Sequence, residues 1–201
     1  MADVQTLFVT KLYRAAAEGV NNGELLRSCL SIAAEDAAGQ AWSKEKGYRG
    51  YTSYASLNDL PKRDPNIAAL KGVLDKHAAA FAKALNLELS GRRVKLDSLW
   101  INVLEPGGAH SGHIHPHSVL SGTYYVDVPP GSSALKLEDP RLPLMMAAPT
   151  RSEDAPEEER TFVYVTPKAG DVLMWESFVR HEVLANGAKR ARVSISFNYS
   201  L

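Results

Sequence analysis

Two hydrophobic periods divide the chain. Before residue 92, apolar residues recur every three to four positions, which is the pattern of one face of an α-helix. From Val94 onward, apolar and polar residues alternate over short segments that end at Pro and Gly, which is typical of β-strands. The 201 residues are therefore predicted to form one domain, in which a mostly helical part, residues 1–92, packs on a β-rich core, residues 93–201.

Two helices are predicted in the first part. The earlier helix contains the apolar positions at residues 25–33 and follows Asn21 and Asn22, either of which can cap its start. The later helix begins at Asp64, which precedes a proline and is suited to a cap position, and its apolar face extends to Leu87. Both helices have a single apolar face, so we expect them to pack against the β-rich core.

The remainder of the first part lacks helical spacing. A short β-like segment is expected at residues 6–9. Residues 42–65 have the Gly, Ser, Asn and Pro content of a loop but contain four aromatic side chains: Trp42, Tyr48, Tyr51 and Tyr54. Such a loop either packs over the core or forms a wall of a pocket, and the sequence leaves both readings open.

The second part is predicted to form an antiparallel barrel or jelly roll. Alternation in the first strand, residues 94–104, places Trp100 and Asn102 on one face and the intervening apolar residues on the other. Short strands separated by Pro and Gly turns, without helices between them, favour an antiparallel architecture. Further strands are predicted at residues 121–128, 134–137, 161–167, 171–177 and 192–200. Residues 139–160, Pro-rich and acidic, are predicted to form a surface excursion.

The overall composition does not indicate a class of binding partner, so partners must be inferred from a local site. Lys plus Arg and Asp plus Glu both number 23, so no net field attracts nucleic acid or an anionic membrane. Cys29 is the single cysteine, which excludes an intrachain disulfide and favours a reducing cytoplasm. No run of about 18 apolar residues predicts a membrane span. The sequence is compatible with a homodimer.

A histidine cluster is the strongest chemical signal. Four of the six histidines lie between His110 and His117. On an extended chain, His113 and His115 project from the same face and can reach one metal ion, and His181 from a distant strand can complete the site. Imidazole suits iron, zinc, copper or nickel. For His110 and His117, roles behind the ligands or at the surface are expected.

A buried cation is predicted beyond the last histidine. In residues 192–198, Arg192, Ser194, Ser196 and Asn198 alternate with apolar side chains and share one face of a strand. A guanidinium inside a small barrel is costly without an anion, and its planar fork matches a carboxylate. We therefore expect a cosubstrate that carries a carboxylate.

These motifs together resemble a known family. The segments EPGGAHSGHIHP, LSGTYYVDVP, EDPR, KAGDVLMWESFVRH and RVSISFN, in this order and spacing, are similar to the iron(II)- and 2-oxoglutarate-dependent oxygenases. The likeness is most detailed over residues 94–200 and is closest to a bacterial group distantly related to prolyl hydroxylases. The resemblance implies a double-stranded β-helix, a jelly-roll variant, and Fe(II) as the cofactor. It also implies hydroxylation of a substrate with consumption of 2-oxoglutarate and dioxygen.

The resemblance also implies roles for individual residues. His113 is the first iron ligand and His181 the distal one, while Arg192 with Ser194 holds the far carboxylate of 2-oxoglutarate. Arg190 is the alternative anchor if the register shifts. Two further contacts to the cosubstrate are expected, from Asn102 and Tyr124 on neighbouring strands.

Position 115 departs from the family pattern, which has Asp or Glu there. Three neutral imidazoles leave the Fe(II) site at +2, and dianionic 2-oxoglutarate then brings it to zero. A carboxylate from Asp127, Glu138 or Asp139 is the alternative to His115 as a ligand. Two other readings stay open: a three-histidine dioxygenase that needs no 2-oxoglutarate, and a non-catalytic barrel that binds a metal or ligand. The sequence carries no recognition code for the prime substrate.

Overall fold

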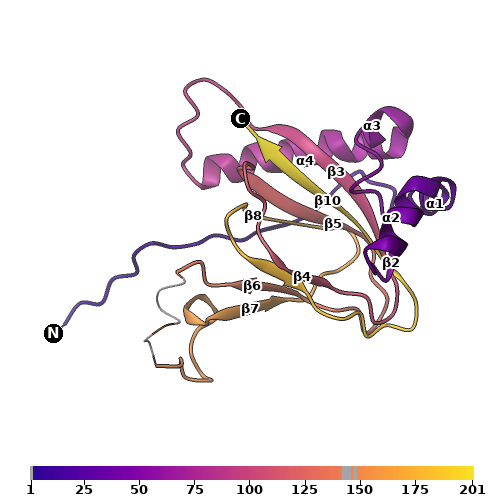
Figure 1. Cartoon of the computed structure of the whole chain (residues 1–201). Helices are drawn as coiled ribbons and strands as arrows, with labels where there is room; N and C mark the ends of the chain where they lie inside the picture. Colours follow the sequence, from indigo (N-terminus) through magenta and orange to yellow (C-terminus); the bar gives the residue numbers. More distant parts are fainter. Residues whose placement is uncertain (1, 142–145, 147–148) are drawn as a thin grey trace.

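Two antiparallel sheets face each other across a narrow interior (Figure 1). The structure, a computed structural model, describes residues 2–141, 146 and 149–201. The large sheet contains, in spatial order, β1 (Tyr13–Ala16), β8 (Asp171–Glu176), β5 (Leu120–Asp127), β10 (Arg192–Ser200), β3 (Lys95–Leu104) and β2 (Gly50–Thr52). The small sheet contains β4 (His110–His113), β9 (His181–Val183), β6 (Leu135–Glu138) and β7 (Phe162–Val165). The predicted antiparallel β architecture is confirmed.

The helices begin where the sequence places capping residues. The Asn21 side chain accepts hydrogen bonds from the first turn of α1 (Asn22–Glu35), and the Asp64 side chain does the same for α4 (Pro65–Ala84). Both predicted helices are therefore confirmed. Two shorter helices, α2 (Ala37–Glu45) and α3 (Leu60–Arg63), and a 3-10 turn at Glu157–Glu159 also form.

Two local predictions for the first part differ from the structure. The strand expected at residues 6–9 forms later, at Tyr13–Ala16, where it can pair with β8 at the edge of the large sheet. The segment expected to be loop from residue 42 contains the end of α2, because Asp36 ends α1 and also caps α2 by accepting a hydrogen bond from Gly39 N. Both differences reflect contacts or caps that apolar periodicity does not reveal.

The main core lies between the helices and the outer face of the large sheet. Leu70, Leu74 and Phe81 of α4 are buried in one cluster with alternate residues of the strands, among them Ile101 and Ile195. Each fully buried side chain of this size contributes roughly 1.5–3 kcal/mol relative to exposure. In Figure 1, the helices accordingly lie on the side of the large sheet that faces away from the small sheet.

One glycine allows this packing. Gly122 of β5 lies under the Phe197 ring, and a Cβ atom there would come within 2.5 Å of Phe197 Cε2 and 2.6 Å of the Leu173 carbonyl oxygen. Any side chain at this position would therefore force the strands or the ring to move.

None of the helices in the described part of the chain has both the length and the apolar character that crossing a membrane requires.

The inner face of the large sheet is polar along β10, whereas Leu173 and Trp175 of β8 are apolar. The alternating positions of β10 bring Arg192, Ser194, Ser196 and Asn198 to this face, as predicted. Arg192, Ser194 and Asn198 are buried, and Ser196 is half-buried. The small sheet covers them with a second, smaller apolar cluster that includes Leu135 and Leu137. Polar side chains are thus enclosed between two sheets, which is where a binding site is expected.

Candidate metal centre

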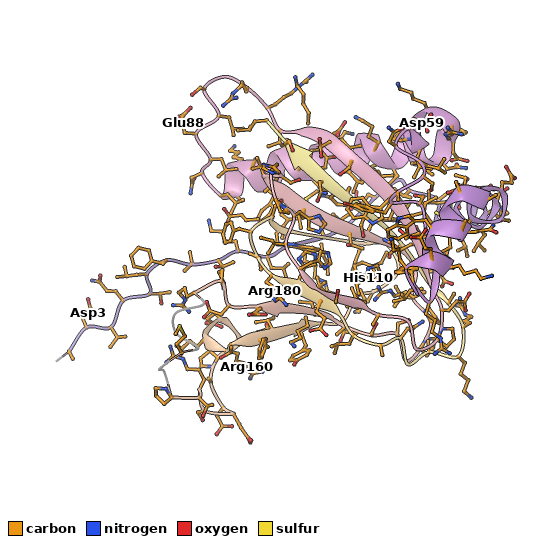
Figure 2. All side chains as sticks on the ribbon, viewed as in Figure 1. Asp3, Asp59, Glu88, His110, Arg160 and Arg180 are labelled. Atoms are coloured by element: carbon orange, nitrogen blue, oxygen red, sulfur yellow. The ribbon has the colours of Figure 1, made fainter. Side chains whose placement is uncertain are left out.

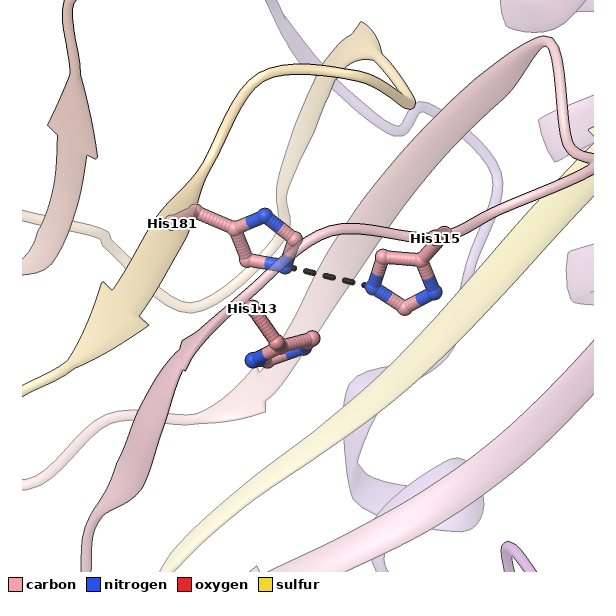
Figure 3. Close-up of side chains that lie close together, drawn as sticks. All are labelled: His113, His115 and His181. Atoms are coloured by element: carbon pink, nitrogen blue, oxygen red, sulfur yellow. Dashed lines mark hydrogen bonds between the residues drawn. The ribbon is translucent and has the colours of Figure 1, made fainter. Parts of the chain in front are cut away.

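Three histidine side chains converge between the sheets (Figure 3). His113 ends β4, His181 begins β9, and the two residues are direct partners in the antiparallel register. His115 lies just beyond β4, where its backbone N–H donates to the Ser177 carbonyl oxygen at 3.1 Å. The donor nitrogens of all three imidazoles lie within 4.8 Å of one another. Strand pairing therefore brings together the three residues that the sequence selected.

Backbone carbonyls orient two of the rings. Nδ1 of His113 lies 2.7 Å from the Ser111 carbonyl oxygen, and Nδ1 of His181 lies 3.0 Å from the Val179 carbonyl oxygen. Because Nδ1–H donates in these contacts, Nε2 of each ring is left with its lone pair for a metal. Nε2 of His115 and Nε2 of His181 are 3.2 Å apart. This separation suits two nitrogens bound to one ion at about 2.0–2.1 Å each.

Two of the imidazoles, those of His115 and His181, are held in the form that binds metals. Burial, followed by the charge of the neighbouring His113, lowers the pKa of His115 to about 4 and that of His181 to about 3. Both rings are therefore neutral at neutral pH, as metal coordination requires. Trp100 stacks on His115, with ring centroids 5.9 Å apart and an interplanar angle of 28°. Three such imidazoles fit iron, as well as zinc, copper or nickel.

The carboxylates considered as alternative ligands have other partners. Each of them pairs with an arginine: Asp127 with Arg190, Glu138 with Arg180, and Asp139 with Arg141. Within residues 2–141, 146 and 149–201, the metal-binding group that contains the histidines includes none of these carboxylates. The ion pair of Arg190 with Asp127 also removes Arg190 from the interior, since its side chain is 60% exposed.

A cavity runs from the three histidines to Arg192. The residues that line it come from both sheets, and include Trp100, Asn102, His110, Thr123, Tyr125, Trp175, Arg192, Ser194 and Ser196. The Arg192 side chain is 2% exposed, and its Nη1 donates to the Ser133 carbonyl oxygen at 3.1 Å. Among the described residues, no carboxylate forms an ion pair with this guanidinium, and its Nε has no hydrogen-bond partner.

An unpaired buried guanidinium is costly. Burial lowers the pKa of Arg192, but arginine keeps its charge in proteins, so the cost of desolvating that charge remains. A carboxylate that enters the cavity would supply the missing acceptors in the geometry that a guanidinium fork prefers. The predicted burial of Arg192 and Ser194 on one polar face is confirmed, and their surroundings fit a carboxylate.

The two other residues expected to contact the cosubstrate, Asn102 and Tyr124, face different parts of the protein. Asn102 lines the cavity, and its Nδ2 donates to Ser196 Oγ at 3.1 Å, which leaves Oδ1 buried without a partner. Turning the amide over would instead direct its N–H donors into the cavity. Tyr124 faces the main core, where its hydroxyl donates to Asn22 Oδ1. Because side chains alternate along β5, Tyr125 rather than Tyr124 lines the cavity, with its ring centroid 5.6 Å from Arg192 Cζ.

His110 belongs to the cavity as well, whereas His117 does not. His110 lies between the two sheets (Figure 2), and its Nε2 is 2.9 Å from the Tyr48 hydroxyl. Burial, then the charges of Arg192 and His113, lower the pKa of His110 to about 4. His117 is exposed, in a left-handed backbone conformation with φ of 70°. The predicted surface position is therefore confirmed for His117 only.

The aromatic loop takes both of the roles left open by the sequence. Tyr51 is buried in the main core and donates a hydrogen bond to Asp36. Tyr48 contacts His110, and Tyr54 packs edge-on against Trp100 with ring centroids 5.2 Å apart. The N-terminal part of the chain thus packs on the barrel and also closes one side of the site.

The surface excursion is described only in part. Residues 142–145 and 147–148, which fall inside the predicted excursion, lie outside the described residues. Of its described residues, 149–154 are exposed.

Every unpartnered buried polar atom of the described side chains belongs to a residue that lines the cavity. These atoms are Asn102 Oδ1, Trp175 Nε1 and Arg192 Nε. Buried polar groups in proteins are nearly always hydrogen-bonded, and leaving one unpaired costs about 1–3 kcal/mol. Three such atoms in one place indicate that a polar molecule binds there. No sequence pattern singles out Trp175, because a tryptophan in an apolar strand is usually a core residue.

Comparisons with known proteins agree with this arrangement. A family model described as "Putative 2OG-Fe(II) oxygenase" matches residues 98–198, a span that contains the three histidines and Arg192. Among solved structures, the chain is similar to a Pseudomonas putida prolyl-4-hydroxylase, with 18% identity and a TM-score of 0.63 over 96% of this chain and 94% of that one. No curated protein matches the chain.

Two further solved structures share the architecture. One is the α-ketoglutarate-dependent epimerase SnoN from nogalamycin biosynthesis, with 16% identity and a TM-score of 0.63 over 95% of this chain and 76% of that one. The other is HygX from Streptomyces hygroscopicus, solved with nickel and 2-oxoglutarate, with 15% identity and a TM-score of 0.58 over 96% and 83% of the two chains. At these identities the likeness establishes the fold, and the predicted double-stranded β-helix is confirmed.

Proposed function

Because this chain belongs to the 2OG-Fe(II) oxygenase family, whose cofactor is Fe(II) and whose cosubstrate is 2-oxoglutarate, we propose that it couples the oxidative decarboxylation of 2-oxoglutarate to hydroxylation of an organic substrate. The observation that carries the proposal is Arg192, a buried guanidinium without a carboxylate partner in the described chain, in the same cavity as three convergent imidazoles. A metal site alone would not require this cation.

In this proposal His113, His115 and His181 hold the iron. Their donor set is neutral, so Fe(II) keeps its full charge of +2 at the site, and the dianionic cosubstrate brings the total to zero. His115 takes the place of the carboxylate that is usual in the family, and its ring lies between Trp100 and His181. Stacking on Trp100 limits the ring orientation, and Nε2 of His115 lies 3.2 Å from Nε2 of His181, which supports His115 as the third ligand.

The cosubstrate would lie between the histidines and Arg192. Trp100, which stacks on His115, pairs with Ser196 across β3 and β10. Arg192 is four residues before Ser196, which corresponds to about 13 Å along the strand. The Arg192 side chain covers part of this length, and the remainder suits a five-carbon dicarboxylate. Ser194, Asn102 and Tyr125 line the intervening wall and are the proposed contacts to the far carboxylate.

The protein supplies placement, and the cofactor supplies the oxidation chemistry. Iron held by His113, His115 and His181 would supply the activation of dioxygen, with one oxygen atom going to succinate as 2-oxoglutarate loses carbon dioxide and the other going to the hydroxylated substrate. Arg192 fixes one end of the cosubstrate, which limits the orientations of the other end at the histidines. Burial of the cavity walls excludes bulk water and strengthens the interaction of Arg192 with a carboxylate.

The experiment is a titration without oxygen. Fe(II) and then 2-oxoglutarate are added to the wild-type protein and to Arg192→Ala, and the visible charge-transfer band of the chelate is recorded. We expect the band in the wild type and a loss of affinity of roughly 10- to 100-fold in Arg192→Ala, because a hydrogen bond to a charged group contributes about 1.5–3 kcal/mol. Arg190→Ala is the matched control, since this arginine forms an exposed ion pair with Asp127.

The result of the titration distinguishes the proposed function from its two alternatives. A band of equal strength in Arg192→Ala would contradict the role of Arg192. Iron binding without any response to 2-oxoglutarate would favour a three-histidine dioxygenase that binds its substrate directly. Failure of the wild type to bind iron, with no difference in His113→Ala, would leave only a ligand-binding barrel.

A further inference from the structure

Trp175 presents a buried hydrogen-bond donor next to the histidines. Its side chain is 2% exposed, it lines the cavity, and Nε1 has no partner among the described residues. The indole ring is inclined by 59° to the His181 ring, with 4.6 Å between their centroids. The Trp175 side chain therefore lies at the end of the cavity where the proposed metal ligands converge.

Apolar packing does not account for an indole here. Trp175 packs in the small cluster with Leu135, Leu137 and Val179, contacts that a phenylalanine could make without introducing an N–H group. Buried tryptophan N–H groups usually find an acceptor, and an unpaired one is destabilising. A tryptophan at this position thus indicates that an acceptor is present when the site is in use.

Trp175 and Arg192 lie towards opposite ends of the cavity. On β5, Trp175 pairs with Ser121, whereas Tyr125, whose ring faces Arg192, is four residues further along, or about 13 Å of strand. A molecule that satisfies both donors needs acceptors at both of its ends. 2-Oxoglutarate has this property, since it carries a carboxylate at one end and a keto acid at the other, and at neutral pH it has no donor of its own.

We propose that Trp175 Nε1–H donates a hydrogen bond to an oxygen at the keto-acid end of 2-oxoglutarate. This rests on the proposed function and adds a second binding residue to Arg192. The Nδ1 atoms of His113 and His181 are already engaged with backbone carbonyls, so these rings offer no spare donor to the cosubstrate. Trp175 supplies the donor that an enclosed, negatively charged keto-acid end requires.

Indole NMR tests this contact directly in the wild-type protein. The chain has three tryptophans, Trp42, Trp100 and Trp175, so a ¹⁵N-tryptophan sample gives three indole resonances. The protein is loaded with Zn(II), which is diamagnetic and redox-inactive and binds histidine sites. Trp175→Phe and Trp42→Phe identify the signals. On addition of 2-oxoglutarate, we expect the Trp175 N–H proton to move downfield, while the Trp42 signal stays in place.

Affinity gives a second readout. With Fe(II) and without oxygen, the charge-transfer titration should show roughly tenfold weaker 2-oxoglutarate binding in Trp175→Phe, which corresponds to about 1.4 kcal/mol. Iron affinity should be unchanged, and Trp42→Phe, which alters a tryptophan outside the cavity lining, should match the wild type. The shift itself is measured in the wild-type protein. If Trp175→Phe misfolds, Trp42→Phe and Trp100→Phe together assign the Trp175 signal by elimination.

Two results would overturn the inference, and they are distinguishable. If 2-oxoglutarate binds, as judged by the charge-transfer band, but the Trp175 resonance does not move, Trp175 is not its donor and the proposed function survives. If 2-oxoglutarate does not bind at all, the proposed function fails and the role of Trp175 fails with it.

Discussion

The large and small sheets divide stability and chemistry between them. The cluster between the helices and the large sheet contains 23 buried hydrophobic residues, and the cluster on the small-sheet side contains seven. Two of the proposed metal ligands, His113 and His181, belong to strands of the small sheet, whereas Arg192 and Ser194 belong to the large sheet. In this proposal, strands of the small sheet supply metal ligands, and the large sheet, on which the helices pack, anchors the cosubstrate.

A single strand, β10, contributes both to the main core and to the cavity. In β10, Ile195 and Phe197 face the helices, while Arg192, Ser194 and Ser196 face the cavity. The period of two keeps these roles on opposite faces. Changes on the helix side should then cost stability without altering the site, and changes on the small sheet should affect both.

The largest effect is expected on the helix side. Leu74→Ala deletes a fully buried side chain of α4 and should lower the free energy of unfolding by about 2–5 kcal/mol. Zn(II) affinity of the folded protein should stay at the wild-type value, because Leu74 packs on the face of the sheet opposite the cavity. Denaturant unfolding and metal titration by calorimetry measure the two quantities.

The matched change on the small sheet is Leu137→Ala. Leu137 is the register partner of His181 across β6 and β9. Its truncation should lower both the free energy of unfolding and the affinity for Zn(II). The expected loss of affinity is roughly tenfold, the low end of the effect seen when residues that support metal ligands are changed. Equal metal affinity in the two variants would contradict the division between the sheets.

A smaller effect of opposite sign is expected at Arg192. In the ligand-free protein, Arg192→Met removes a buried charge that has no carboxylate partner in the described chain, so the free energy of unfolding should rise by about 1 kcal/mol. Arg190→Met, at an exposed ion pair, should change it by no more than about 0.5 kcal/mol. A marked loss of stability in Arg192→Met would show that the guanidinium supports the fold rather than awaiting a ligand.

The sequence predicted the strands and the metal candidates well because both follow a local period. Alternation in β3 and β10 placed Asn102, Arg192 and Ser194 on the cavity face without any knowledge of the register. The pair His113 and His115 was visible because a spacing of two puts two side chains on one face. The role of His181 is less visible in the sequence, because it depends on the pairing of β9 with β4, two strands far apart in the chain.

What the sequence missed depends on long-range pairing or on atoms left without partners. Tyr124 and Tyr125 are adjacent aromatic residues, and only the register of β5 shows that Tyr125 is the one in the cavity. His110 was expected behind the ligands or at the surface rather than in the cavity lining, because its contact with Tyr48 joins segments distant in sequence. The unpartnered N–H of Trp175 is a property of the folded interior, which no sequence pattern reports.

The smallest effect is expected from the pH dependence of stability. Burial, then Arg192 and His113, lower the pKa of His110 to about 4, and Tyr48 packs against its ring. The pKa in the unfolded chain is about 6.5. Between these values the unfolded chain binds more protons than the folded one, so the stability that neutral His110 contributes is present above pH 6.5 and is lost as the pH falls.

This contribution can be isolated by a pair of substitutions. From pH 7 to pH 6, the metal-free wild type should lose about 0.7 kcal/mol of unfolding free energy through His110. In His110→Gln, which keeps a polar group near Tyr48 but does not titrate, that part of the slope should disappear. His117→Gln, at an exposed position, should keep the wild-type slope. Urea unfolding at both pH values measures the difference. Identical slopes in all three proteins would mean that His110 is as easily protonated in the fold as in the unfolded chain, and that the interior between the two sheets is open to water at this point.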